Sequence, residues 1–441
     1  MARTSSFSEK PLGNRPRRLV HWLNPAGEKK VHSLVDKVYK LKNLALAWEK
    51  VKRNKGAGGI DGQSIADFED DLVGNLKTLH EELRTQTYQP QPVKRQLIPK
   101  SGQPGKYRPL GIPNVYDRVC QQAILNRLEP IFEPTFDDAN FGYRRGRSTK
   151  DAMRKIWCEL EQGYEWVVDA DLKDFFGSAD HDKIMELLNQ RVADGRVLRL
   201  LESMMKVGYS DGKQIHQTNR GVPQGGVISP LISNILLTPF DREMRRKAYR
   251  LTRFADDWLV TCRTRAEAQA VLKFAKQVLE KLGVVLNEEK TRIVHVRNGF
   301  EFLGYKIKRG QRPLKLAAHK IKSKTRQGSL YVYPRQKSID HFKEQIRKRT
   351  SRKAPISTMV LIQQINPVIR GWGNYYRKAH VRKLFNQLDR WIVRRLWSHR
   401  HKRWRNCGWR ILSAAKLYSE LGLVGLVHLI PSLNRRRFAA L

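Results

Sequence analysis

The chain has 441 residues, which at roughly 150 residues per domain allows about three domains. It carries 85 Lys and Arg residues against 42 Asp and Glu residues, so its formal net charge at pH 7 is +43. A compact fold with this excess repels itself unless a polyanion is bound, so nucleic acid is the leading partner and a membrane surface the second candidate. No apolar run is long enough to span a bilayer, and the polar N-terminus lacks a signal core, so we expect a cytoplasmic protein.

The first predicted elements are an arm and a series of helices. Residues 1–30 mix Ser, Pro, Arg and Lys without periodicity, which predicts a flexible basic arm. Apolar residues at three- and four-residue spacing predict helices over residues 33–55, 64–86, 116–132 and 148–162. Between them, residues 95–113 predict a basic β-hairpin that turns at Gly102 to Gly105.

The second half contains two strand signals and then changes character. Residues 166–171 predict a short buried strand followed by helices to about residue 207, and residues 253–262 predict a hairpin with two acids at its tip. Beyond Gly304 acids become rare while Arg, Lys and Trp accumulate, and the pattern over 337–400 is mostly helical. We therefore predict a domain boundary near residue 308.

Adjacent acids stand inside an apolar strand-forming segment at Asp256 and Asp257. Burying bare carboxylates is costly unless a cation neutralises them. A third acid, Asp171, ends the apolar run that begins at Trp166. If the two strands lie side by side, these acids offer the oxygen ligands that a pair of Mg²⁺ ions requires for nucleotide addition. The alternative is that the acid pair only occupies a hairpin turn.

Eight motifs in this order resemble the fingers and palm of a reverse transcriptase of the bacterial group II intron type. They lie at residues 58–62, 98–113, 141–148, 168–176, 221–231, 254–257, 286–291 and 302–305. The resemblance implies an α+β right-hand polymerase with an antiparallel palm sheet over residues 31–308, in which residues 31–95 form an N-terminal extension. A helical thumb or maturase domain would follow over residues 309–441.

The resemblance also assigns the metal-binding roles. Asp171 and Asp256 would be the principal ligands of two Mg²⁺ ions and Asp257 a supporting ligand, and Leu172 is included among the metal-binding positions. Asp169 is interpreted as structural, because the following pair of phenylalanines is correctly spaced from Asp171.

Further positions would handle the deoxynucleotide substrate. Phe176 would pack under the sugar and clash with a 2′-hydroxyl, Gln224 would contact the nucleotide, and Lys100 and Arg108 would clamp the triphosphate. The alternative for both cations is a solvated basic hairpin. Lys290 would protonate the leaving pyrophosphate, or else pair with a neighbouring glutamate at the surface.

Residues 365–377 resemble the maturase domain of group II intron proteins, and residues 391–405 interleave tryptophans with basic side chains. Such a surface suits a folded RNA, although the tryptophans are also explained as thumb core. His399, His401 and Cys407 lack a fourth ligand at finger spacing, so no zinc is expected.

The implied function is DNA synthesis on RNA with magnesium and deoxynucleotides, together with binding of the parent intron RNA to assist its splicing. The partners would be intron RNA, the duplex of RNA template and DNA primer, and target DNA. No paired-cysteine endonuclease pattern precedes Leu441, so mobility would use another primer. Two alternatives stay open: a splicing cofactor with a vestigial polymerase site, and a domesticated reverse transcriptase in defence or repair.

Overall fold

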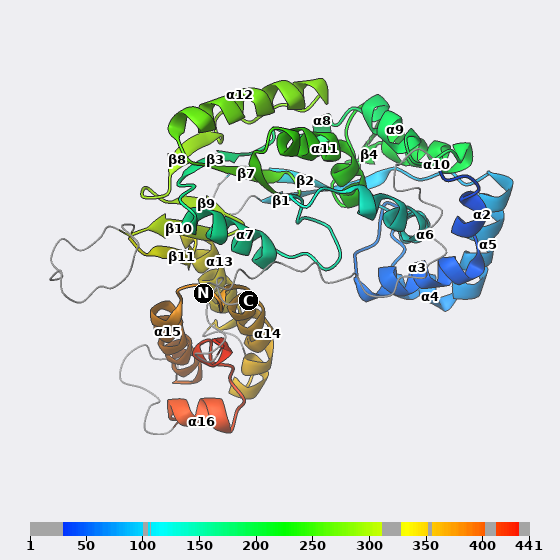
Figure 1. Cartoon of the computed structure of the whole chain (residues 1–441). Coiled ribbons are helices and arrows are strands. Elements are labelled where there is room, and N and C mark those ends of the chain that lie inside the picture. The colour runs from blue at the N-terminus through cyan, green and yellow to red at the C-terminus, as the bar shows by residue number, and fades with distance from the viewer. Residues whose placement is uncertain are drawn as a thin grey trace, which may run out of the picture.

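The computed structural model describes residues 30–99, 105, 107–310, 328–351, 355–401 and 412–431. Helices and three separate sheets alternate along these residues, which confirms the expected α+β class (Figure 1). Most of the predicted N-terminal arm, Lys100 and Cys407 lie outside the described residues.

The N-terminal helices pack around α6 and form one end of the molecule (Figure 1). They are α2 (Val35–Val38), α3 (Leu41–Arg53), α4 (Ile65–Asp70), α5 (Leu72–Thr85) and α6 (Val115–Phe132). The apolar spacing of α3 buries Leu44 and Trp48, and the Trp48 ring stacks on Phe68 with centroids 4.8 Å apart.

Each of the first two predicted helices is divided in the structure. The side-chain amide of the buried Asn43, in the first turn of α3, donates to the carbonyl oxygen of Val38 at 2.8 Å. A side chain thus satisfies the last carbonyl group of α2, which a continuous helix would have bonded to a backbone N–H. Asp71 likewise accepts from the backbone N–H of Gly74 at 3.1 Å and starts α5 directly after α4. Local capping therefore interrupts a continuous apolar pattern.

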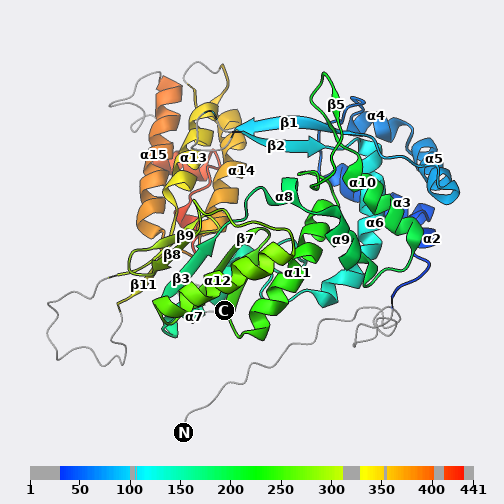
Figure 2. The same cartoon turned by 90° about the horizontal axis from the view of Figure 1, so that it is seen from above.

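The predicted basic hairpin is present as β1 (Val93–Pro99) and β2 (Tyr107–Ile112), which pair antiparallel with Pro99 opposite Tyr107. β1 also pairs in parallel with β4 (Tyr209–Ser210), which pairs with β5 (Ile215–His216). Seen from above, the hairpin extends from the side of the N-terminal helices toward that of the C-terminal helices (Figure 2).

The palm sheet is antiparallel, as predicted, and has the strand order β6-β7-β3-β8. Its strands are β3 (Trp166–Ala170), β6 (Arg250–Phe254), β7 (Asp257–Cys262) and β8 (Arg292–His295). Three helices contact it: α7 (Thr149–Glu161), α11 (Ser229–Arg246) and α12 (Arg265–Lys281), with α7 and α12 on opposite sides (Figure 1). Short helices complete this part of the chain: η1 (Glu133–Thr135), α8 (Phe175–Ser178), α9 (His181–Asn189) and α10 (Gly195–Lys206).

Alternate residues of the central palm strands enter two different cores. Val168 and Trp258 belong to the larger cluster with α11 and α12, whereas Val167 and Leu259 belong to the cluster that includes α7. This two-residue period is what a strand covered on both faces requires.

The second cluster continues into the C-terminal part of the chain, so palm and thumb share apolar packing. That part begins with the sheet β11-β10-β9, formed by β9 (Phe300–Phe302), β10 (Tyr305–Arg309) and β11 (Leu330–Pro334). The helices α13 (Gln336–Arg349), α14 (Thr358–Tyr376), α15 (Arg382–His401), α16 (Ala414–Ser419) and η2 (Val427–Leu429) follow. The boundary predicted near residue 308 falls within β10.

The described tryptophans of the C-terminal helices make the contacts that the thumb-core alternative predicts. Trp372, Trp391 and Trp397 are half-buried and pack against the second cluster. The indole N–H of Trp397 donates to the Leu412 carbonyl oxygen at 2.7 Å. In the part of the chain that the structure describes, no helix is long and apolar enough to cross a membrane.

Phe342→Ala tests the packing of the thumb. Phe342 is 1% exposed and stacks on Trp372 at 4.6 Å, so its truncation leaves a cavity between α13 and α14. We expect a loss of about 3–5 kcal/mol in the free energy of unfolding, measured by urea denaturation. The control Met359→Ala, at a residue 55% exposed, should change it by about 0.5 kcal/mol or less. Equal midpoints for the two variants would contradict this packing.

Candidate functional site

The two adjacent acids lie at the tight turn between β6 and β7. Phe254 pairs with Asp257, so Ala255 and Asp256 alone make the turn. Ala255 has φ +60°, in the left-handed region. The predicted hairpin with acids at its tip is therefore confirmed: Asp256 occupies the turn itself, and Asp257 is the first residue of β7.

The third acid is brought to the same edge of the palm sheet. β3 pairs with β7 so that Ala170 lies opposite Trp258, which leaves Asp171 and Asp257 next to this last pair. Leu172, the residue after Asp171, forms an isolated antiparallel bridge with Leu286. The condition set by the sequence, that the two strands lie side by side, is thus met.

The acids perturb one another electrostatically. Desolvation by the surrounding protein, followed by the charges of Asp256 and Asp171, raises the pKa of Asp257 to about 7. Burial is also the main cause that raises the pKa of Asp256, with Asp171 adding to it. Negative charge is therefore concentrated here without full compensation, a condition that favours a cation.

Two basic side chains approach from the segment that follows α12. Lys290 Nζ lies 2.5 Å from Asp171 Oδ2, and Arg292 Nη2 lies 3.1 Å from Asp169 Oδ2. The sequence left open a surface pair between Lys290 and a neighbouring glutamate. Instead, Glu288 pairs with Lys276, and Lys290 pairs with Asp171. Lys290 thus joins the acidic site.

Phe176 and Gln224 line one pocket of about 230 Å³, which opens between α8, β1, β2 and the loop before α11. Arg95 and Arg220 line the same pocket and were not singled out from the sequence. Arg108 is exposed on β2 and does not line this pocket.

The loop that carries Gln224 packs closely against the backbone of β2. A Cβ on Gly225, which has φ +118°, would lie 2.3 Å from the Gly111 carbonyl oxygen. In addition, the N–H of Gly111 donates to the Gln224 carbonyl oxygen at 2.6 Å. Gly225 therefore permits a close approach to the backbone of β2, and this contact fixes the loop of Gln224 against the β1–β2 hairpin.

Tyr143 was also given no role by the sequence. Burial raises the pKa of Tyr143, Asp256 and Asp257 raise it further, and Arg108 opposes them. The phenol therefore lies within electrostatic reach of both the acids and the β1–β2 hairpin. The residue is 51% exposed, and its backbone has φ +55°.

Three acids at one edge of an antiparallel sheet, together with a basic hairpin and a helical C-terminal part, are typical of a nucleic acid polymerase of the right-hand type. The model for the reverse transcriptase (RNA-dependent DNA polymerase) family matches residues 98–307, and that for the group II intron maturase-specific domain matches residues 339–416. The chain therefore belongs to the group II intron family of reverse transcriptases with a maturase domain.

Individual relatives agree with this assignment. The chain is 33% identical over 337 residues to "Protein YkfC" of Escherichia coli, covering 67% of this chain and 88% of that protein. It is 29% identical over 424 residues to "Group II intron-encoded protein LtrA" of Lactococcus lactis subsp. cremoris, covering 78% of this chain and 69% of that protein. A third relative, the "Uncharacterized 91 kDa protein in cob intron" of Schizosaccharomyces pombe, is 24% identical, with 79% and 51% covered.

Asp257→Asn tests the electrostatic strain of the site in metal-free protein. A carboxyl whose pKa is raised on folding stabilises the fold below its unfolded pKa and loses that contribution as the pH rises through about 7. The amide does not titrate, so the variant should gain stability relative to the native chain between pH 5 and 8. Because Asp257 is exposed, solvent screening limits the gain to about 0.5–1 kcal/mol.

Urea denaturation with a chelator at both pH values measures this gain. Glu280→Gln, which removes an exposed carboxylate from α12, is the matched control and should follow the native pH profile. Parallel profiles for native and Asp257→Asn protein would show that the site stores no such strain.

Proposed function

We propose that the protein synthesises DNA on an RNA template with magnesium, using Asp171, Asp256 and Asp257, and that its maturase domain binds the parent intron RNA to assist splicing. The observation that carries the first part is the meeting of β3 and the β6–β7 turn at one edge of the palm sheet. A group of acids at one edge of the sheet, in a chain of net charge +43, serves no purpose in binding a polyanion alone.

The donor set suits magnesium, a hard cation that prefers carboxylate oxygens. Among the described residues no three His, Cys, Asp or Glu side chains converge as a ready-made metal site. Asp171 is instead engaged by Lys290, whose ammonium supplies one positive charge. Asp171, Asp256 and Asp257 are proposed to hold two Mg²⁺ ions together with substrate oxygens, with Leu172 beside them.

When bound, magnesium lowers the pKa of the attacking 3′-hydroxyl and stabilises the leaving pyrophosphate. The chain's own residues then bind and orient the nucleotide. Gln224 and Phe176 are proposed to contact the base and the sugar from the pocket that they share, and Arg108 the triphosphate. Lys290, next to Asp171, is proposed to donate the proton to pyrophosphate. The role of Lys100 remains a prediction from the sequence.

The second activity is supported by the surface of α15. Its buried residues face the thumb core, while Arg382, Lys383, Arg390, Arg394 and Arg400 are exposed. Exposed guanidinium and ammonium groups bind phosphates. The match to a maturase-specific domain and the printed name of the Lactococcus relative support intron RNA as the partner. The duplex of template and primer, target DNA and a bacterial cytoplasmic location complete the proposal.

Asp256→Asn tests the polymerase activity directly. We expect primer extension on an RNA template to fall by about a hundredfold or more, since metal ions contribute several kcal/mol of transition-state stabilisation. Affinity for the RNA template, measured by filter binding, should stay within about twofold because a single acid contributes little to polyanion binding.

Glu280→Gln, on the outer face of α12, is the control and should extend primers like the native chain. If the native chain binds RNA tightly but extends nothing, the polymerase proposal fails. The splicing cofactor with a vestigial site is then the better account.

Phe176→Ala tests sugar selection. Phe176 is half-buried, packs edge to face against Phe175 with centroids 5.2 Å apart, and lines the pocket with Gln224. Removing the ring opens space for a 2′-hydroxyl, so the ratio of ribonucleotide to deoxyribonucleotide incorporation should rise by about tenfold or more. Single-nucleotide extension assays measure this ratio. An unchanged ratio would place sugar selection elsewhere.

A further inference from the structure

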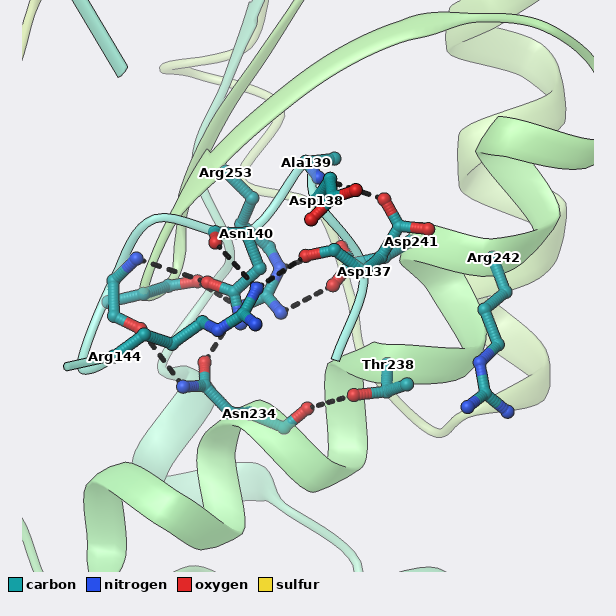
Figure 3. A network of polar contacts seen from close by, with 12 residues as sticks. Asp137, Asp138, Ala139, Asn140, Arg144, Asn234, Thr238, Asp241, Arg242 and Arg253 are labelled. Carbon is teal, nitrogen blue, oxygen red and sulfur yellow. Dashed lines mark hydrogen bonds and ion pairs between the residues drawn. The ribbon is translucent and has the colours of Figure 1, made fainter. Parts of the chain in front are cut away.

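A fully buried arginine lies directly beneath the turn that carries the acids. Arg253, in β6, is 0% exposed and so is its partner Asp241, on α11. The guanidinium forms a two-pronged contact: Nε donates to Asp241 Oδ1 at 2.7 Å and Nη2 to Oδ2 at 2.5 Å (Figure 3). A buried charge is tolerated only with such pairing, and the bidentate geometry also fixes the orientation of the guanidinium plane.

The remaining nitrogen of this guanidinium reaches the turn itself. Arg253 Nη1 donates to the carbonyl oxygen of Ala255 at 2.9 Å and to Oδ1 of Asn234 at 3.2 Å. Ala255 is the left-handed residue that precedes Asp256. One planar side chain therefore ties the peptide leading into Asp256 to α11.

A second segment supports the same turn from the strand edge. The Arg253 N–H donates to Ala139 and its carbonyl accepts from Phe141, both at 2.8 Å. Asn234 Nδ2 donates to the Gly142 carbonyl oxygen at 2.9 Å, so this side-chain amide joins α11 to the segment that contains Ala139 and Gly142. A Cβ on Gly142 would lie 2.2 Å from the Ala255 nitrogen, which leaves the turn no room to move toward this segment.

We infer that Arg253, held by Asp241 and Asn234, is a positioning residue that fixes the β6–β7 turn and thereby the direction of the Asp256 and Asp257 carboxylates. It acts through the Ala255 carbonyl and touches no substrate. This inference rests on the proposed polymerase function. Lysine would not replace it, because its single nitrogen cannot span both Asp241 oxygens and still reach Ala255.

The decisive variant is the double substitution Arg253→Met with Asp241→Leu. It removes both buried charges together, and apolar replacement of a buried ion pair is often neutral or stabilising, so the fold should persist. Arg246→Gln with Glu243→Gln removes another ion pair of α11, 2.8 Å apart, that lies on the exposed surface of the helix. That pair is the matched control. Arg253→Lys retains the charge and loses the tether.

Three properties are measured for each variant: primer extension, Mn²⁺ affinity from electron paramagnetic resonance titration, and the melting temperature. For the double variant and for Arg253→Lys we expect kcat to fall by about ten- to a hundredfold with KM for deoxynucleotide nearly unchanged, since small misplacement of reacting groups costs up to about this much. Mn²⁺ affinity should fall several-fold. The control pair should retain native values.

A folded double variant with native kcat and native Mn²⁺ affinity overturns the inference. If the double variant unfolds, Arg253→Lys decides in the same way. If the native chain binds Mn²⁺ but extends no primer, the polymerase proposal has failed and the Mn²⁺ comparison alone tests the positioning role. A native chain that neither extends primers nor binds Mn²⁺ overturns both.

Discussion

The pairing of β3 with β7, in the register that sets Ala170 opposite Trp258, is the contact on which the site depends. A slip of one residue would turn every side chain of β3 to the other face, exchanging Val167 and Val168 between two different cores. Because both faces are buried, the hydrophobic penalty for such a slip is large. The packing of apolar residues thereby determines where Asp171 stands relative to Asp257.

The same edge of the sheet shows how charge is distributed in this basic chain. Lysines and arginines elsewhere create a field that attracts polyanions over long range, whereas the three acids form a small region of opposite sign. Only Lys290 among the described residues forms an ion pair with Asp171, and no ion pair to Asp256 or Asp257 is present there. Asp257 therefore keeps a pKa near 7 as a consequence of burial and its acidic neighbours. Negative charge that lacks a partner lowers the local stability of the fold, and it is the condition that a bound cation would relieve.

The thumb is joined to the palm by packing and by polar contacts. Arg309, on β10, donates to the carbonyl oxygen of Leu160 at the end of α7 and lies 2.8 Å from Glu165. Trp157 of α7 stacks on His380 between α14 and α15, with centroids 6.1 Å apart. The basic face of α15 is consequently held in a defined relation to the palm sheet.

The sequence by itself determined the local elements and the identity of the acids. The turn at Ala255 and Asp256, the basic hairpin and most helices follow from patterns of a few residues, and the motif order was enough to assign Asp171 to the same site. It did not reveal that Asn43 and Asp71 divide two helices, since capping depends on where a side chain meets a free carbonyl or N–H.

Tertiary structure alone decided what surrounds the acids. Arg253 was visible as a charged residue within a strand, but its partners Asn234 and Asp241 lie 19 and 12 residues away along the chain. Lys290 is 119 residues from Asp171, and Gly142, which approaches Ala255 closely, is 113 residues from it. Contacts of this kind arise when distant segments pack together, so no local pattern of residues encodes them, whereas the turn and strand propensities that place the acids act over neighbouring residues.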